Sequence, residues 1–394
     1  MPEHPFPRLL QRPERSFFLF GPRGVGKSTW LKTGFPDAVQ LDLLDATLHL
    51  ELAHQPGRLE ALIGKRPARS WVVLDEIQKI PALLDEVHRL MEAKGWRFVL
   101  CGSSARKLRR GGVNLLAGRA VERQMEPFCS RELGKSFDWS FAVEWGCLPL
   151  VHNDPAHAAD ILSTYVHTYL KEEIKEEGIV RQLPPFLRFL AIAGQLNGQL
   201  VNSQNIAREA SVPRANVDVY FSILEDTLLG HFLPPYRPQV KVREQAHPKF
   251  FWVDPGIARA AAGLVRDPVD RLWKGTALET LVFHELRVHN HTQNKHRPIA
   301  CYRTAAGVEI DFIIETQKRQ RSAPARVVCI EVKLAEKWDR QWEQPMRSLK
   351  AISKQVQVDK MIGVYTGARA YHFDGVDVLP ISQFLDQLHD GQIF

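Results

Sequence analysis

The feature that most constrains the fold is a glycine-rich run that directly follows the apolar segment FFLF at 17–20: Gly21, Pro22, Arg23, Gly24, Val25, Gly26, Lys27, Ser28 and Thr29. The spacing GxxxxGK[ST] between a strand and a helix is typical of a phosphate-binding loop, although a glycine-rich turn can match it by chance. Small residues let backbone N–H groups point at phosphates, and the helix N-terminus adds positive potential. We therefore expect this run to bind ATP, with Lys27 reaching the β- and γ-phosphates and Ser28 holding Mg²⁺.

Two adjacent acids follow a second apolar run, in WVVLDEIQ. We expect Asp75 to bind Mg²⁺ through water and Glu76 to polarise the water that attacks the γ-phosphate. A strand that ends in a solvated acidic turn is the alternative. Because both acids are present, the pair favours hydrolysis of ATP over a kinase reaction.

A third apolar run, RFVLC, ends in Gly102, Ser103 and Ser104. Ser103 is a candidate for contact with the γ-phosphate or the attacking water, and a plain turn at the strand end is the alternative. Downstream, Arg119 is the first candidate to stabilise the transferred phosphoryl group in a neighbouring subunit, which predicts a homo-oligomer. Competing candidates, which a solvated basic face explains equally well, are Arg106, Arg109 and Arg110.

The pattern of apolar runs predicts an α/β protein with three domains. Short buried strands alternate with helices over 1–150, which indicates a parallel sheet covered on both faces, as in a RecA- or AAA-like P-loop domain. Residues 151–255 are mostly helical, and a helix, a tight turn at 211–213 and a second helix have helix–turn–helix spacing. Strands return over 256–394, at 306–315, 326–333 and 361–367.

The ordered set GPRGVGKS, LDEIQ, CGSSARKL, LLAGRA and EPFCSREL resembles a family of prokaryotic AAA+-like P-loop ATPases whose C-terminal region is a domain of unknown function. The likeness continues through YVHTYLKEEI, SVPRANVDVYFSILEDT and KFFWVDPGIARA to the C-terminal strands, and so covers nearly the whole chain. The resemblance implies a RecA-like ATPase core, a winged-helix middle and a restriction-endonuclease-like end. It implies no particular reaction.

The helix that starts near Arg214 would be the recognition helix of such a winged helix. Arg214 and Asn216 are candidates for contact with bases or phosphates, and Lys241, Arg243 and Lys249 are candidates for a basic wing. The same helix carries acids that phosphates repel. A winged helix that serves only as a structural adaptor is therefore an alternative interpretation.

The C-terminal run RVVCIEVK contains two charged residues two positions apart. Strand periodicity puts Glu331 and Lys333 on one face. If the neighbouring strand EIDFII pairs with this one, Asp311 can face Glu331, and the two carboxylates can share Mg²⁺ while the lysine orients water. With Glu279 on the preceding helix, the set Glu279, Asp311, Glu331 and Lys333 resembles the PD-(D/E)xK nucleases. Cross-strand acid–base pairs that only stabilise an edge are the alternative.

Hydropathy, cysteine count and net charge narrow the possible functions further. No apolar run is long enough to span a bilayer and no signal-peptide core is present, so we expect a cytoplasmic protein without membrane contact. The 5 cysteines form no CxxC pair, and the net charge of +7 suits a polyanionic partner such as DNA. We expect an ATPase coupled to magnesium-dependent DNA cleavage. The alternative is a nucleotide-switched binding protein whose nuclease-like tail is inactive and serves for docking.

Overall fold

The computed structural model describes residues 6–103, 108, 116–170, 183–237, 247–304, 307–321, 323–352 and 355–394. These residues form two compact units. The N-terminal unit consists of Arg8–Pro127 and Ile223–Leu229, and the C-terminal unit consists mainly of Phe128–Ser222 and Gly230–Phe394. The boundaries expected near 150 and 255 stay predictions.

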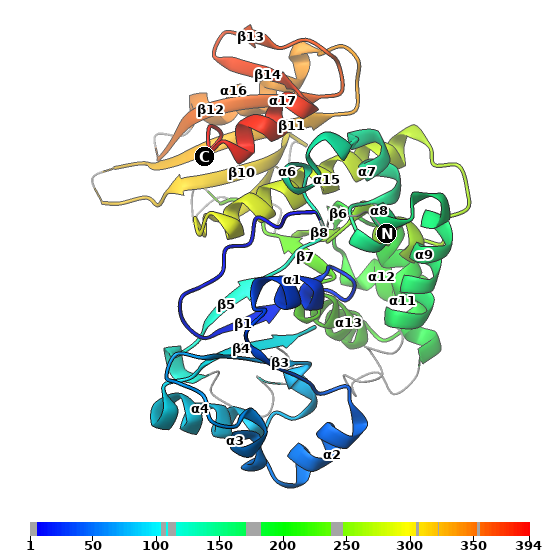
Figure 1. The fold of residues 1–394 in the computed structure, drawn as a ribbon. Coiled ribbons are helices and arrows are strands. Elements are labelled where there is room, and N and C mark those ends of the chain that lie inside the picture. Colours follow the sequence, from blue (N-terminus) through cyan, green and yellow to red (C-terminus); the bar gives the residue numbers. More distant parts are fainter. Residues whose placement is uncertain are drawn as a thin grey trace. The chain divides into compact units, whose positions relative to one another are not determined.

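The N-terminal unit is built on a five-stranded parallel sheet with the order β2-β3-β4-β1-β5 (Figure 1). This confirms the parallel sheet that the apolar runs predicted. The strands are β1 (Phe17–Phe20), β2 (Val39–Asp42), β3 (Trp71–Asp75), β4 (Arg97–Gly102) and β5 (Val121–Gln124). The helices are α1 (Lys27–Gly34), α2 (Ala46–His54), α3 (Arg58–Ile63) and α4 (Leu83–Lys94).

Apolar side chains cover both faces of this sheet. Every residue of β1 is buried, as expected for a central strand of a parallel sheet. On one face, the ring of Phe17 meets Trp30 and Phe35 from α1 and its C-terminal end, with ring centroids 6.3 and 6.0 Å away. On the other face, Phe18 and Phe20 belong to the core that leucines of α2, α3 and α4 complete. The two aromatic layers fix β1, and with it the start of the glycine-rich loop.

The first part of the C-terminal unit is helical. Its helices are α6 (Ser130–Leu133), α7 (Trp139–Trp145), α8 (Pro149–Asn153), α9 (Ala158–Thr164), α11 (Leu183–Gln195), α12 (Ser203–Ala210), most of α13 (Arg214–Asp226) and α14 (Pro255–Ala261). A three-stranded sheet, ordered β6-β8-β7, lies among them, with β6 (Gln199–Leu200), β7 (Gly230–Leu233) and β8 (Lys249–Trp252). The turn between α12 and α13 holds Ser211 in the left-handed conformation, with φ of 53°. Two helices joined by a tight turn are present, and their use as a DNA-reading winged helix stays a prediction.

The second part is a six-stranded mixed sheet, ordered β13-β14-β12-β11-β10-β9. Helix α15 (Arg271–Thr292) and helix α17 (Ile381–His389) pack on one face, and α16 (Gln344–Ile352) packs on the other (Figure 1). The strands are β9 (Ile299–Arg303), β10 (Glu309–Gln317), β11 (Ala325–Lys333), β12 (Val356–Tyr365), β13 (Tyr371–Phe373) and β14 (Val376–Pro380). Both faces of β11 are therefore covered, and the side chain of Glu331 is buried.

A buried polar network ties α6, α15 and α17 together. Glu285 is fully buried, and its carboxylate accepts hydrogen bonds from the backbone N–H of Ser130 at 2.6 Å and the Ser130 hydroxyl at 3.0 Å. Its other contact is with Nε2 of His389 at 2.7 Å. The thiol of Cys129 lies nearby, within 4.8 Å of these ligand-type atoms. Because the carboxylate is already engaged by α6 and α17, the network serves to join the helices.

We predict opposite effects for two glycine-to-alanine substitutions in helices of the C-terminal unit. A Cβ at Gly194 of α11 would lie 2.3 Å from the backbone nitrogen of Ala262, so Gly194→Ala forces the helices apart. Overpacking of this kind costs about 1–3 kcal/mol of unfolding free energy. A Cβ at Gly275 of α15 meets nothing within 4 Å. Gly275→Ala should therefore raise stability by about 0.5–1 kcal/mol, because alanine favours the helix.

Thermal unfolding of both variants, followed by circular dichroism, checks this prediction. The melting temperature should fall for Gly194→Ala and rise for Gly275→Ala. Equal melting temperatures for the two variants would contradict the close approach of the helix backbones at Gly194.

Candidate functional sites

The glycine-rich loop has the backbone that phosphate binding requires. Gly24 and Gly26 adopt φ of 80° and 88°, in the left-handed region that favours glycine. Gly21 follows β1, and a Cβ there would lie 2.2 Å from the carbonyl oxygen of Met125. The loop therefore curls tightly between β1 and α1, and only glycine fits at its entrance.

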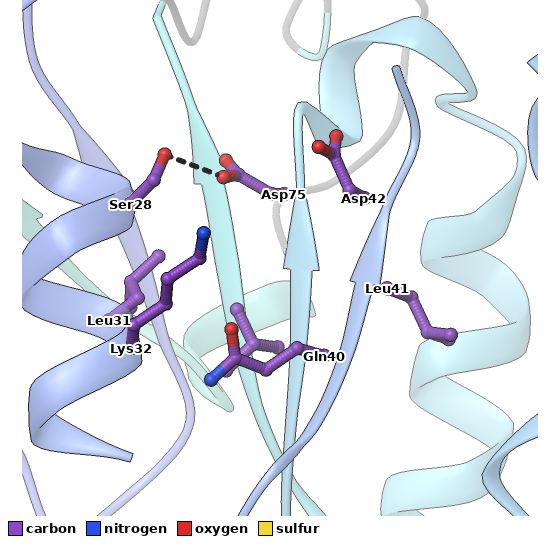
Figure 2. A pocket seen from close by; sticks show the side chains of 8 residues that line it. Ser28, Leu31, Lys32, Gln40, Leu41, Asp42 and Asp75 are labelled. Carbon is purple, nitrogen blue, oxygen red and sulfur yellow. Dashed lines mark hydrogen bonds between the residues drawn. The ribbon is translucent and has the colours of Figure 1, made fainter. Parts of the chain in front are cut away.

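The side chains of Lys27 and Ser28 are held by the loop and by β3. The ammonium of Lys27 donates hydrogen bonds to the carbonyls of Gly21 and Pro22, at 2.6 and 2.9 Å. The hydroxyl of Ser28 donates to Oδ2 of Asp75 at 2.9 Å, as Figure 2 shows. Hydroxyl and carboxylate oxygens are the ligands that Mg²⁺ prefers. Ser28 and Asp75, the two residues predicted to hold Mg²⁺, are close enough to bind the same ion, and their oxygen atoms suit it.

A pocket of about 220 Å³ opens beside this pair. Asp42 lies at the end of β2, next to Asp75 in the sheet register, and both line the pocket. The side chain of Lys32 extends from α1 along the pocket (Figure 2). Sequence reasoning missed Asp42 and Lys32. The acid at the end of VQLD was the available signal, because carboxyl ends of parallel strands meet at one edge.

The second acid of the pair is positioned by a glutamine. Glu76 adopts a left-handed conformation, with φ of 58°, directly after β3. The amide of Gln78 donates to the carboxylate of Glu76 and lies 3.3 Å from the hydroxyl of Ser103. A Cβ at Gly102 would lie 2.3 Å from Oε1 of Gln78, so the glycine leaves room for this amide. Gln78 was not predicted, although it stands only two positions after Glu76.

Arg119 forms a surface ion pair in the structure. Its Nε donates to Oε1 of Glu92 on α4 at 2.7 Å, and 42% of its side chain is exposed. This hydrogen bond lowers the pKa of Glu92. Action of Arg119 in a neighbouring subunit stays a prediction. The other serine and arginine candidates, Ser104, Arg106, Arg109 and Arg110, lie outside the described residues.

The predicted residues of the C-terminal strands converge. Strands β10 and β11 pair antiparallel with Phe312 opposite Ile330, which brings Asp311 next to Glu331. Oδ2 of Asp311 accepts a hydrogen bond from the backbone N–H of Val332 at 2.8 Å. The ammonium of Lys333 lies 2.5 Å from Oε1 of Glu331 and 3.6 Å from Oδ2 of Asp311.

Three further charged residues complete this acidic cluster, which we define as Glu279, Glu309, Asp311, Glu331, Lys249 and Lys333. Lys249 lies 2.6 Å from Oε1 of Glu309, 3.7 Å from Oε2 of Glu279 and 3.8 Å from Oδ1 of Asp311. Its side chain is 7% exposed. The expectation that Lys249 belongs to a basic wing is therefore wrong, because the carboxylates draw its ammonium inward. Lys241 and Arg243 lie outside the described residues.

Burial and like charge shift the protonation of this cluster. Burial first, and the Asp311 carboxylate second, raise the pKa of Glu279 to about 8. The same two causes raise the pKa of Glu331 to about 8. Burial alone would lower the pKa of Lys249, but the carboxylates of Glu279, Asp311 and Glu309 raise it above its ordinary value.

One carboxylate oxygen of the acidic cluster lacks a hydrogen-bond partner among the described residues, and a groove lies beside the cluster. Oε2 of Glu331 is buried and has no hydrogen-bond partner among the described residues. A carboxylate oxygen in that position fits a hard divalent cation such as Mg²⁺ or Mn²⁺. Next to Glu279, a groove of about 420 Å³ is lined by Arg271, Thr276 and Lys333. The groove offers two cations and a hydroxyl beside the carboxylates.

Comparison with family models divides the chain into three parts. Residues 13–134 match an AAA domain. Residues 136–267 match a domain of unknown function (DUF8612), and residues 274–384 match another (DUF4143). The loop geometry, the parallel sheet and the first match together support a P-loop domain of the AAA class in the N-terminal unit. The match to the C-terminal strands assigns no activity to them.

An uncharacterized protein of Haemophilus influenzae is 26% identical over 210 residues, which cover 49% of this chain and 52% of that protein. The chain thus spans about half the length of this curated relative. Two solved structures from Aeropyrum pernix show weaker likeness. The ORC2 protein in its ADP form is 13% identical, with a TM-score of 0.33 over 64% of this chain and 88% of that one. The ORC1 protein in complex with DNA is 14% identical, with a TM-score of 0.25 over 68% and 87%. Likeness at this level carries no argument about function.

Among the described residues, no helix combines the length and the apolar character that crossing a membrane requires.

The raised pKa values predict how stability depends on pH without divalent metal. Glu331 has an ordinary pKa of 4.5 and a folded pKa of about 8, so the folded chain keeps a proton that the unfolded chain releases. Stability from this proton is fully present below about pH 4.5 and is lost as the pH rises through about 8, with a slope of up to ~1.4 kcal/mol per pH unit. Glu331→Gln removes this titration.

Urea unfolding in the presence of a chelator, at a series of pH values from 5 to 8.5, measures the effect. The free energy of unfolding should fall more steeply with pH for the unsubstituted protein than for Glu331→Gln. Glu336→Gln, which changes an exposed acid near the same strand, should behave like the unsubstituted protein. Parallel slopes for all three proteins would show that Glu331 titrates normally.

Proposed function

We propose that the N-terminal unit binds and hydrolyses ATP. The observation that carries this proposal is the 2.9 Å hydrogen bond between the Ser28 hydroxyl and the Asp75 carboxylate, directly beside the phosphate-binding loop. The loop backbone would surround the phosphates, and Lys27 would exchange its bonds to the Gly21 and Pro22 carbonyls for the β- and γ-phosphates. Mg²⁺ bound by Ser28 and Asp75 would supply positive charge against the charge that develops on the transferred phosphoryl group.

Glu76 is the residue that we propose to orient the attacking water. Its carboxylate follows β3 and is held by the amide of Gln78, which also approaches the Ser103 hydroxyl. Gln78 is thus a positioning residue for Glu76, and Ser103 is within reach of the same water. Arg119 would act on the nucleotide of a second copy of the chain after leaving Glu92, which makes the proposed active form a homo-oligomer.

Two substitutions separate binding from hydrolysis. Lys27→Ala should weaken ATP binding and lower turnover by about 100-fold or more, because it removes the cation that faces the phosphates. Glu76→Gln should leave binding intact and lower turnover by about 100-fold, because the amide cannot accept a proton from water. ATP affinity by fluorescence titration and phosphate release check both. Lys65→Ala, at an exposed position of the same unit, is the control. Unchanged turnover in Lys27→Ala would mean that the site is misassigned.

We propose, as a second function, metal-dependent cleavage of a phosphodiester at the acidic cluster. The observation that favours it is the convergence of Asp311, Glu331 and Lys333 from two paired strands, with Glu279 beside them. A divalent cation held by Asp311 and Glu331 would act as a Lewis acid there. Lys333, which touches both carboxylates, would orient the water.

Nucleic acid, with DNA as the first candidate, is the substrate class that the charges favour. The chain carries a net charge of +7, and the groove beside Glu279 offers Arg271 and Lys333 to a phosphate backbone. The nuclease-like fold and the winged helix belong to this proposal. The alternative is a nucleotide-switched binding protein in which the acidic cluster only docks a partner. Neutralisation of the carboxylates by Lys249 favours that alternative.

One comparison separates the two interpretations. Supercoiled DNA is incubated with the full chain and Mg²⁺ or Mn²⁺, with and without ATP, beside Asp311→Asn and Glu336→Gln. We expect nicking by the unsubstituted protein and by Glu336→Gln, and its loss in Asp311→Asn with ATP turnover unchanged. Absence of metal-dependent cleavage under every condition would leave the docking interpretation.

A further inference from the structure

Lys249 holds the place of a cation inside the acidic cluster. It stands at the start of β8, in the three-stranded sheet, whereas the acids stand on α15 and on the six-stranded sheet. The ammonium lies between Oε2 of Glu279 and Oδ1 of Asp311, at 3.7 and 3.8 Å, and is anchored by Oε1 of Glu309 at 2.6 Å. A lysine from a separate sheet thus bridges the helical acid and the strand acid.

The two oxygens of Asp311 face different partners. Oδ2 accepts the backbone N–H of Val332 at 2.8 Å and lies 3.6 Å from the ammonium of Lys333. Oδ1 faces Lys249. The oxygen that remains for a second cation is therefore the one that Lys249 approaches. Divalent cations sit about 2.0–2.6 Å from carboxylate oxygens, so a metal ion on Oδ1 would lie within a few ångströms of the ammonium.

We propose that Lys249 and a divalent cation compete for the carboxylate of Asp311, so that metal binding requires Lys249 to withdraw. This inference rests on the proposed metal site of the acidic cluster. Two like charges at such a distance repel strongly at a buried position, because water screens them poorly. A singly charged ammonium attracts the carboxylate less strongly than a divalent cation does, but it is tethered to the chain and is always present. Lys249 therefore sets the metal concentration at which the cluster loads.

Glu309 determines how firmly Lys249 is held. It forms the shortest of the three contacts, and its own side chain is 30% exposed. Arg303 also approaches Glu309, at 3.7 Å. If Lys249 only formed an ion pair with Glu309, its ammonium would not also approach two other carboxylates. The additional approach to Asp311 places the ammonium next to one of the two acids of the proposed metal site, and Glu279 lies at a similar distance from it.

Direct binding of Mn²⁺ to the full chain tests the competition. Metal-free protein is titrated with Mn²⁺, and free Mn²⁺ is measured by electron paramagnetic resonance for the unsubstituted protein, Lys249→Met and Lys135→Met. Lys135 is an exposed lysine of the same unit, so its substitution removes one positive charge outside the cluster. We expect Lys249→Met to bind Mn²⁺ at least ~10-fold more tightly, because a unit charge next to the ion is removed. Lys135→Met should bind like the unsubstituted protein, and adding Asp311→Asn to Lys249→Met should abolish the gain.

The possible failures are distinguishable. Equal Mn²⁺ affinity in Lys249→Met and the unsubstituted protein would overturn the competition and leave the proposed metal site intact. No Mn²⁺ binding by any variant at millimolar concentration would overturn both. Because Lys249→Met leaves buried carboxylates without a partner, it can fail to fold, which circular dichroism reveals. The double variant Lys249→Met/Glu309→Gln then replaces it, since it removes one carboxylate together with the lysine, and it should bind Mn²⁺ at least ~10-fold more tightly than Glu309→Gln alone, from which it differs by the one positive charge.

Discussion

Parallel pairing of β1, β3 and β4 is the constraint on which the nucleotide site depends. The carboxyl ends of parallel strands lie at the same edge of the sheet. This edge therefore brings together three segments that are far apart in sequence: the glycine-rich loop after β1, Asp75 at the end of β3 and Ser103 after β4. The aromatic layers on both faces of β1 keep that edge in register. The 2.9 Å contact between Ser28 and Asp75 is the direct result.

In the C-terminal unit, the main constraint is the burial of several carboxylates close together. Four carboxylates meet where β10, β11 and α15 come together, and buried charges of one sign need cations nearby. Lys333 comes from the same strand as Glu331, whereas Lys249 is brought by another sheet. Burial and the Asp311 carboxylate raise the pKa values of Glu279 and Glu331, and the nearby lysines offset part of that rise.

Most of the correct predictions came from local sequence patterns, namely motif spacing and strand periodicity. The loop at 21–28 lies between a strand and a helix that follow each other in sequence, so its spacing predicted a phosphate-binding loop, and strand periodicity put Glu331 and Lys333 on one face. The place of Asp311 beside them depended on the pairing of its strand with theirs, which the structure shows. Lys249 was misassigned, and Glu309 was missed. The contact between them joins two sheets, and no local pattern encodes which sheet edges meet. Gln78 was within reach of sequence reasoning, because it follows Glu76 by two positions, but its role depends on the space that Gly102 leaves.

Hydrogen–deuterium exchange of the full chain, with and without Mg²⁺ and a non-hydrolysable ATP analogue, tests the nucleotide site most directly. We expect slower exchange of the backbone amides at 22–29, because these N–H groups would donate to phosphates, and slower exchange at 75–78, because Asp75 would then help to hold Mg²⁺. Exchange at 22–29 that stays unchanged at saturating nucleotide would contradict the account, whatever happens elsewhere in the chain.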